Sequence, residues 1–503
     1  MGFTQQHLYF GGVNQSNTLT DNYWIKFYGK TGEDRSEVQG VSFDDNKNMY
    51  IVGRRRQLAY HGYYTGGNGT YEAVIYKYDQ NGNLQWQKRL GETGGVNSGY
   101  DSTYFVEVAT DGSGNSYAVG RVFEGNVNNN PLGGNVPNGP TWGVLAKFNS
   151  SGALQWQRTI KGNASASTNS QAEYYNYTKL DGVTIDNNGD ILVCGTLYYS
   201  RYDGFIAKFN SSGTIQWQKQ FGSSTSWTVL NNIKTDSSGN IFIAGNSNFG
   251  AGAAVQGGYH GLLARFNSSG ALQWLRKFTS GKGGSFVNNS IHSMTANDNM
   301  IVLCGGTSTA TFKFNHSGTL QWQRQYGDKT AANDGQMRGG RSVAIDNDDN
   351  VYTTDFISGA TYGLVAANSG TDQMLMKYDT DGNLVYRRFI GSTTSEAEFN
   401  SQSDNLHINK QNSIVLNMAA SGVYGNVANM TIKIPNDGSL TSSSTYSGYV
   451  FTDTPYYTIT NDSSSHTVAN DTTLSVSSGN ATITTSVYST GNTTQSTSKI
   501  TIS

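Results

Sequence analysis

Apolar and polar residues alternate in short runs along most of this chain, and the runs recur in a fixed order. One unit spans 183–219 and contains four such runs, at 183–186, 191–195, 204–209 and 214–219. Alternation with a period of two predicts β-strands. The first and third runs end in Asn-Asn-Gly-Asp and Asn-Ser-Ser-Gly, and Asn and Gly accept the positive φ that tight hairpin turns need. Each unit is therefore expected to be a four-stranded antiparallel sheet.

The fourth strand of the unit carries the most regular part of the repeat, a Leu/Ile-Gln-Trp segment that ends in Lys or Arg. Its copies contain Trp86, Trp156, Trp217, Trp274 and Trp322, and a variant has Tyr386 in the Trp position. Second and third strands each occur seven times, whereas fourth strands occur six times inside the repeat region. Four short strands repeated about every 50–70 residues are typical of propeller blades. We therefore predict an all-β fold, a seven-bladed β-propeller.

The missing fourth strand lies at the beginning of the chain. Residues 21–29 contain Trp24 and read as a fourth strand without the first three. An open ring would leave unpaired strand edges, so we expect this N-terminal strand to close the ring as the outer strand of blade seven.

The combined pattern is Asp-x-x-Gly-Asn, an apolar strand ending in Gly, and Lys-Phe-Asn-x-x-Gly-x-x-x-Trp. It resembles the bacterial β-propeller repeat called SBBP and covers about 24–440. The resemblance implies the propeller fold. It implies no catalytic residues, because that family is functionally mixed.

The predicted division has three parts: an N-terminal arm at 1–20, the propeller at 21–440, and a C-terminal extension at 441–503. About half of the extension is Ser or Thr. Alternating stretches such as 457–460, 473–476 and 481–484 indicate strands with polar faces. Such a β-rich extension could lie along the propeller or bind a neighbouring subunit, and disorder is the alternative.

Loop lengths predict which face of the propeller carries function. The turns after the first and third strands are tight, whereas the long segments follow the second and fourth strands and share the opposite face. These long loops are rich in Tyr, Gly and Asn, and Tyr offers contact area at a low entropic cost. The candidate binding residues are Tyr60, His61, Tyr63, Tyr64, Tyr71, Trp142, Tyr174, Tyr175, Tyr198, Tyr199, Tyr202, Tyr259 and His260. The alternative is that these aromatic side chains pack the loops against one another.

Other candidate chemistry is sparse. The Asp- and Asn-rich turns suggest calcium but lack the full ligand series, so hairpin turns explain them. The basic cluster 54–56 could contact an acidic partner or be a solvated loop. The carboxylates Glu72, Glu107 and Asp181 could converge on the axis, as in propeller glycosidases. Cys194 and Cys304 occupy equivalent strand positions, which favours small buried residues over a disulfide or a metal pair. No cofactor or metal is expected.

Charge and composition narrow the function. The net charge is −2 and charged residues make up 14%, so nothing favours nucleic acid or anionic membranes. We see no apolar stretch long enough to insert in a membrane and no secretory signal. A particle protein needs no export signal, so we expect a non-enzymatic structural component of a phage virion, of the tail or fibre type. Its partners would be other virion proteins, copies of itself, or a host-surface glycan. The alternatives are a bacterial cell-surface adhesin or extracellular carbohydrate-binding propeller, and a polysaccharide-degrading enzyme.

Overall fold

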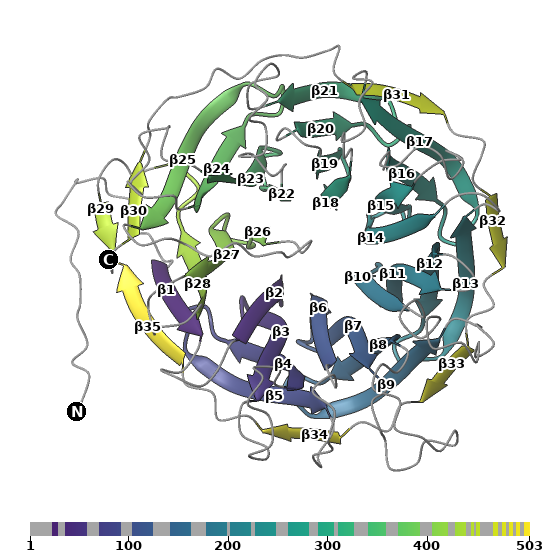
Figure 1. The fold of residues 1–503 in the computed structure, drawn as a ribbon, viewed down its shortest axis with the longest axis horizontal. Coiled ribbons are helices and arrows are strands. Elements are labelled where there is room, and N and C mark those ends of the chain that lie inside the picture. The colour runs from purple at the N-terminus through teal and green to yellow at the C-terminus, as the bar shows by residue number, and fades with distance from the viewer. Residues whose placement is uncertain are drawn as a thin grey trace.

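A computed structural model shows an all-β ring of seven blades around a central axis (Figure 1). The described residues are 23–28, 36–57, 70–91, 103–123, 141–161, 178–198, 202–222, 227–247, 260–280, 290–305, 310–325, 341–358, 371–392, 405–420, 428–438, 444–446, 449–452, 466–470, 475–478, 482–485, 489–492 and 497–502. They contain no helix, and so no helix that could span a membrane. The predicted seven-bladed β-propeller is confirmed.

Each blade is an antiparallel sheet whose first strand lies nearest the axis. The first strands are β2 (Ser36–Phe43), β6 (Thr103–Thr110), β10 (Lys179–Ile185), β14 (Thr228–Thr235), β18 (Ile291–Ala296), β22 (Ser342–Ile345) and β26 (Leu406–Ile408). The second strands are β3 (Met49–Gln57), β7 (Ser116–Phe123), β11 (Ile191–Tyr198), β15 (Ile241–Ser247), β19 (Ile301–Gly305), β23 (Val351–Ser358) and β27 (Ile414–Ala420).

The third and fourth strands lie progressively further from the axis. The third strands are β4 (Thr70–Tyr78), β8 (Thr141–Phe148), β12 (Tyr202–Phe209), β16 (His260–Phe266), β20 (Ala310–Phe314), β24 (Thr371–Tyr378) and β28 (Ala428–Ile434). The fourth strands are β5 (Leu84–Gly91), β9 (Leu154–Lys161), β13 (Ile215–Gly222), β17 (Leu272–Ser280), β21 (Leu320–Gln325), β25 (Leu384–Ser392) and, in blade seven, β1 (Tyr23–Tyr28).

The N-terminal strand closes the ring as predicted. β1 pairs antiparallel with β28, with Trp24 opposite Lys433 and Phe27 opposite Met430. Blade seven is therefore built from both ends of the propeller sequence. This pairing covers the edge of β28 that an unclosed seventh blade would leave open.

The C-terminal extension lies along the outside of the ring and adds strands to the blade edges (Figure 1). Its strands are β29 (Ser444–Tyr446), β30 (Tyr449–Thr452), β31 (His466–Asn470), β32 (Ser475–Ser478), β33 (Thr482–Thr485), β34 (Ser489–Asn492) and β35 (Thr497–Ile502). They reach blade six through β30, then blades four, three, two, one and seven in that order. Each of these six contacts is an antiparallel pairing with a fourth strand. We call this segment the outer belt.

The repeated Trp links each blade to the next. Trp86 Nε1 donates to the carbonyl of Ser150 at 3.0 Å, and Lys77 Nζ donates to the same oxygen at 3.2 Å. Ser150 lies in the turn between the third and fourth strands of blade two. Trp156 and Lys147 make the same pair of bonds to Ser211 in blade three. The predicted contact of the Trp with a neighbouring blade is therefore present, and the third-strand Lys shares it.

The glycine that ends the second-strand motif has a different cause. A Cβ on Gly195 would lie 2.0 Å from the carbonyl oxygen of Lys179. That oxygen is forced inward because β10 has an irregularity in its pairing between Leu180 and Gly182. The first five blades share such a register shift and such a glycine, whereas the last two show neither within the described residues. The glycine thus permits a bulge in the strand that faces the axis.

The hydrophobic core lies between adjacent blades. One cluster joins Tyr117 and Val119 of blade two to Val183, Ile191 and Phe205 of blade three. Both cysteines are fully buried and neither is in a disulfide, which confirms the interpretation of these positions as small core residues.

Candidate functional site

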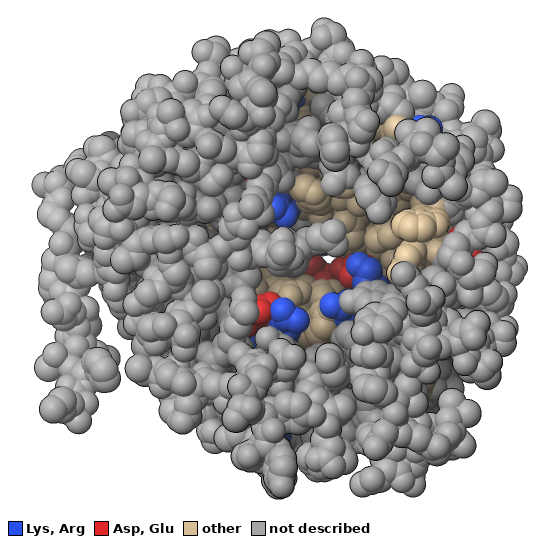
Figure 2. Space-filling view, in the orientation of Figure 1, with Lys and Arg blue, Asp and Glu red and all other residues tan. Residues whose placement is uncertain are grey.

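Charged side chains meet at one mouth of the axial channel, where the first strands of blades one to three begin (Figure 2). Arg54 follows the motif glycine of β3 and lies opposite Glu37 of β2. Its Nε and one terminal nitrogen contact the same Glu37 oxygen at 2.8 and 2.6 Å. Arg121 holds the equivalent position in blade two, opposite Tyr104. The repeat geometry therefore brings two arginines to one height in neighbouring blades.

Both arginines contact one aromatic ring. The Arg121 guanidinium carbon lies 4.2 Å from the centre of the Tyr104 ring, and that of Arg54 lies 5.2 Å from it. Burial lowers the pKa of Arg121 to about 9, an effect that Asp181 opposes and Arg54 reinforces. Tyr104 is buried. A ring held between two cations fixes both guanidinium groups in place.

Blade three contributes an opposite pair of charges to this mouth. Lys179 and Asp181 lie on β10, and Lys179 Nζ contacts an Asp181 oxygen at 2.8 Å. Asp181 is the residue skipped in the β10 bulge, and bulges commonly redirect a side chain next to functional sites. We call Glu37, Arg54, Tyr104, Arg121, Lys179 and Asp181 the channel mouth. It presents ordered charges of both signs on a rigid frame.

An exposed aromatic pair lies on the same face. Trp227 immediately precedes β14 and is 47% exposed. Its ring meets that of Tyr202 edge-on, with the centroids 5.7 Å apart. Exposed aromatic side chains in such pairs are common anchors of binding surfaces. Sequence analysis selected Tyr202 but missed Trp227, although this Trp stands outside the repeated motif and could have been noticed for that reason.

The structure describes five of the thirteen predicted binding residues. Trp142, Tyr202 and His260 lie at or next to the first residue of the third strands of blades two, three and four, and each is partly buried. For Tyr71 and Tyr198 it describes the backbone, on β4 and β11. The remaining predicted residues lie outside the described part of the chain: Tyr60, His61, Tyr63, Tyr64, Tyr174, Tyr175, Tyr199 and Tyr259. Their binding role stays a prediction.

The three candidate carboxylates do not converge. Glu107 and Asp181 lie on first strands, whereas Glu72 lies on the third strand β4 and pairs with Arg89 at 2.6 Å. The expectation that Glu72 faces the axis is therefore wrong, because third strands lie away from the channel.

The acidic turns serve the hairpins. Asp186 Oδ1 accepts the backbone N–H groups of Asn188 and Asp190, and Lys208 contacts its other oxygen at 2.7 Å. Within the described residues no cluster of His, Cys, Asp and Glu could hold a metal ion.

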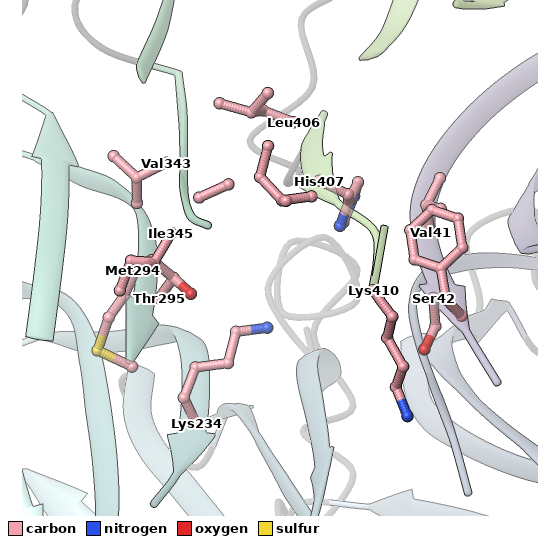
Figure 3. Close-up of a pocket in the computed structure, with 13 residues that line it drawn as sticks. Val41, Ser42, Lys234, Met294, Thr295, Val343, Ile345, Leu406, His407 and Lys410 are labelled. Atoms are coloured by element: carbon pink, nitrogen blue, oxygen red, sulfur yellow. The ribbon is translucent and has the colours of Figure 1, made fainter. Parts of the chain in front are cut away.

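A cavity of about 270 Å³ occupies the opposite end of the axial channel, next to the tight turns (Figure 3). First strands of blades one, four, five, six and seven line it. Lys234 and His407 point into it from different blades, and Met294 and Ile345 contribute apolar surface. Lys410 lies at its edge and forms an ion pair with Asp45.

These features define a β-propeller with an axial channel and one charged, aromatic face. The chain belongs to the family whose model is described as outer membrane protein assembly factor BamB. That model matches residues 203–496, more than half of the chain, and the matched range includes most of the outer belt.

Solved structures similar to this chain have 10–11% sequence identity. A protein of unknown function from Dyadobacter fermentans has 11% identity and a TM-score of 0.37, with 80% of this chain and 99% of that chain covered. A periplasmic gluconolactonase of Pseudomonas aeruginosa has 10% and 0.39, with 72% and 94% covered. An ulvan lyase of polysaccharide lyase family PL25 has 10% and 0.39, with 82% and 96% covered. No curated protein matches the chain.

Proposed function

We propose that this protein is a non-enzymatic binding and structural component on the outside of an assembled particle, a phage tail or fibre. It contacts a host-surface glycan or a neighbouring subunit through the face that carries the channel mouth. The observation that carries the binding role is the exposed Trp227–Tyr202 pair on that face. A rigid aromatic pair gives contact area with little side-chain entropy to lose.

The fixed charges of the channel mouth support recognition by the same face. Glu37 and Asp181 each have a cationic partner within 2.8 Å. Preformed ion pairs keep their geometry when a polar ligand arrives, so they contribute specificity more than affinity. Polar groups at fixed positions beside an exposed aromatic surface suit a glycan or a polar protein surface.

The outer belt supports the structural role. It pairs with the outer edges of six blades. Open strand edges invite pairing with other chains. Covering them directs contacts to the faces of the ring, as a component with one defined orientation in an assembly requires. The description of the matching family, an assembly factor, agrees with a scaffold role.

Binding of the purified protein to a panel of host-surface glycans tests the recognition role. We expect Trp227→Ala to weaken binding at least about tenfold, because anchors of this kind contribute more than 1 kcal/mol. Val385→Ala is the matched control, since Val385 is 54% exposed and lies on β25 of blade six. Equal binding by both variants would remove the aromatic pair from the proposal, and release of reducing sugar from any glycan would overturn the non-enzymatic role.

Mass spectrometry of purified particles tests the location. The protein should be present in virions at a fixed ratio to the other structural proteins. If it occurs only on bacterial cells, the adhesin alternative holds instead.

A further inference from the structure

The inner strands place one residue per blade at a common height in the channel. Each first strand ends in the same kind of turn, in which an Asp or Asn N–H bonds a carbonyl three or four residues later. The position two residues before that Asp or Asn is therefore equivalent in all seven blades. Its occupants are Ser42, Ala109, Thr184, Lys234, Thr295, Ala344 and His407. We call these seven residues the axial layer.

The axial layer contains two basic side chains, three hydroxyl groups and two alanines, and no carboxylate. Five of its members line the 270 Å³ cavity. Lys234 of blade four and His407 of blade seven both point into that space (Figure 3). The layer thus brings a cation and hydrogen-bonding groups together from separate parts of the chain.

The nearby acidic residues are engaged in the turns rather than in the cavity. Asp44 accepts hydrogen bonds from Asn48 and Tyr50. Asp346 accepts them from the backbone of Asn350 and from Tyr352. No Asp or Glu is among the described residues that line the cavity. Its polar groups consequently favour an anion.

The walls of the cavity add a second requirement. Met294, Val343, Ile345 and Leu406 line it from blades five, six and seven. A small pocket with an apolar wall and a few convergent polar groups is typical of binding sites for small organic molecules. A bare inorganic anion would leave this wall against water, whereas a carboxylate with a short hydrocarbon part would cover it.

We propose that the axial cavity binds a small organic carboxylate. Its charged end contacts Lys234 and the hydroxyl groups of the axial layer, with His407 on the opposite side, and its hydrocarbon part lies against Met294 and Ile345. This site is at the end of the channel away from the channel mouth and the aromatic pair. It is therefore independent of the surface contact proposed above.

Equilibrium dialysis of the full chain with radiolabelled hexanoate tests this site, with hexanamide as a neutral probe of the same shape. We expect hexanoate to bind with one site per chain and hexanamide to bind at least tenfold more weakly. Absence of hexanoate binding at millimolar concentration, or equal binding of both probes, would overturn the proposal. This comparison uses the unaltered protein and does not depend on any variant folding.

A matched pair of substitutions locates the site. Lys234→Gln should weaken hexanoate binding at least tenfold, the factor that corresponds to about 1.4 kcal/mol. Lys219→Gln removes the same charge from the fourth strand β13, far from the axis, and should leave binding within twofold. An equal loss in both variants would show that net charge, rather than the cavity, attracts the probe, and would refute the site.

Discussion

The Trp that links neighbouring blades allows a quantitative test of how the ring is held together. Trp156 of blade two donates to the carbonyl of Ser211 in blade three at 3.2 Å. Its ring packs against the core between these blades, and the Arg158 guanidinium carbon lies 5.1 Å from its centre. A Cβ on Gly213 would lie 2.8 Å from this ring, so the turn of blade three is in close contact with it. Trp156→Ala removes all of these contacts.

The expected cost follows from the separate contributions. The lost hydrogen bond is worth about 1 kcal/mol, and the cation–π contact about 0.5–1 kcal/mol. Truncation of a fully buried Trp costs about 3–5 kcal/mol, and Trp156 is half-buried, so its lost packing contributes about 2 kcal/mol. The sum is about 3–4 kcal/mol. Trp156→Phe keeps most of the ring but loses the donor, and should cost about 1 kcal/mol.

Thermal unfolding followed by circular dichroism measures this effect. The entropy of unfolding is about 2.1 cal/mol/K per residue, which for a cooperative ring of roughly 400 residues gives about 0.8 kcal/mol/K. Trp156→Ala should therefore lower Tm by about 4 °C and Trp156→Phe by about 1 °C. Gln155→Ala is the control, because Gln155 is exposed and its amide bonds the carbonyl of Ala153 in its own turn. A Trp156→Ala melting curve that coincides with that of Gln155→Ala would refute the role of the Trp as an interblade link.

Three further predictions concern the bulge, the outer belt and the buried tyrosines. Gly195→Ala should unfold the protein at a much lower urea concentration than Gly189→Ala, because the first Cβ would lie 2.0 Å from a carbonyl oxygen whereas the second meets open space and only the strain of φ +76°; similar midpoints would contradict the close-approach argument. Removal of 441–503 should lower Tm and produce concentration-dependent association in light scattering, because six outer strand edges become exposed; a stable monomer would count against this. Burial, together with Tyr386 and Asp346, raises the pKa of Tyr352. The folded protein then holds this proton where the unfolded chain releases it, so stability should be intact below about pH 10 and fall as the pH rises above it; an unfolding free energy that is flat between pH 9 and 11.5 would disprove the linkage.

The sequence was sufficient to predict the propeller because the local signals agree in every repeat. Tight turns, alternating strands and a Trp at a constant position all indicate the same four-stranded unit. The place of the N-terminal strand followed from a count of strands, and its pairing with β28 bears this out. A count was enough because ring closure leaves one vacant edge for one unpaired strand.

The location of the outer belt on the blade edges could not be predicted in the same way. Its strands are short and rich in Ser and Thr, so they lack an apolar face that would indicate where they pack. They are positioned by backbone pairing with fourth strands, as where β32 pairs with β13 through Lys219 to Gly222. Backbone hydrogen bonds are the same for every sequence, so side-chain patterns do not identify the partner.

The channel mouth was missed for a different reason, although the sequence contains a signal for it. Arg54 and Arg121 both follow the glycine that ends the second-strand motif, and Tyr104 precedes the bulge that this glycine permits. Aligning the repeats on that glycine would have placed both arginines at one height. What the alignment could not show is that one Tyr104 ring contacts both of them, because this depends on the inclination of adjacent blades.

The bulges connect the fold to both proposed sites. A glycine in the second strand is costly for a β-sheet, yet five blades have it where their first strand is irregular, as at Gly195 opposite Leu180. In blade three this irregularity sets Asp181 at the channel mouth. Beyond the irregularity the strand resumes regular pairing and reaches the axial layer at Thr184. One local distortion thus separates the two ends of the channel, so that the mouth can vary its charges while the axial layer keeps its height in every blade.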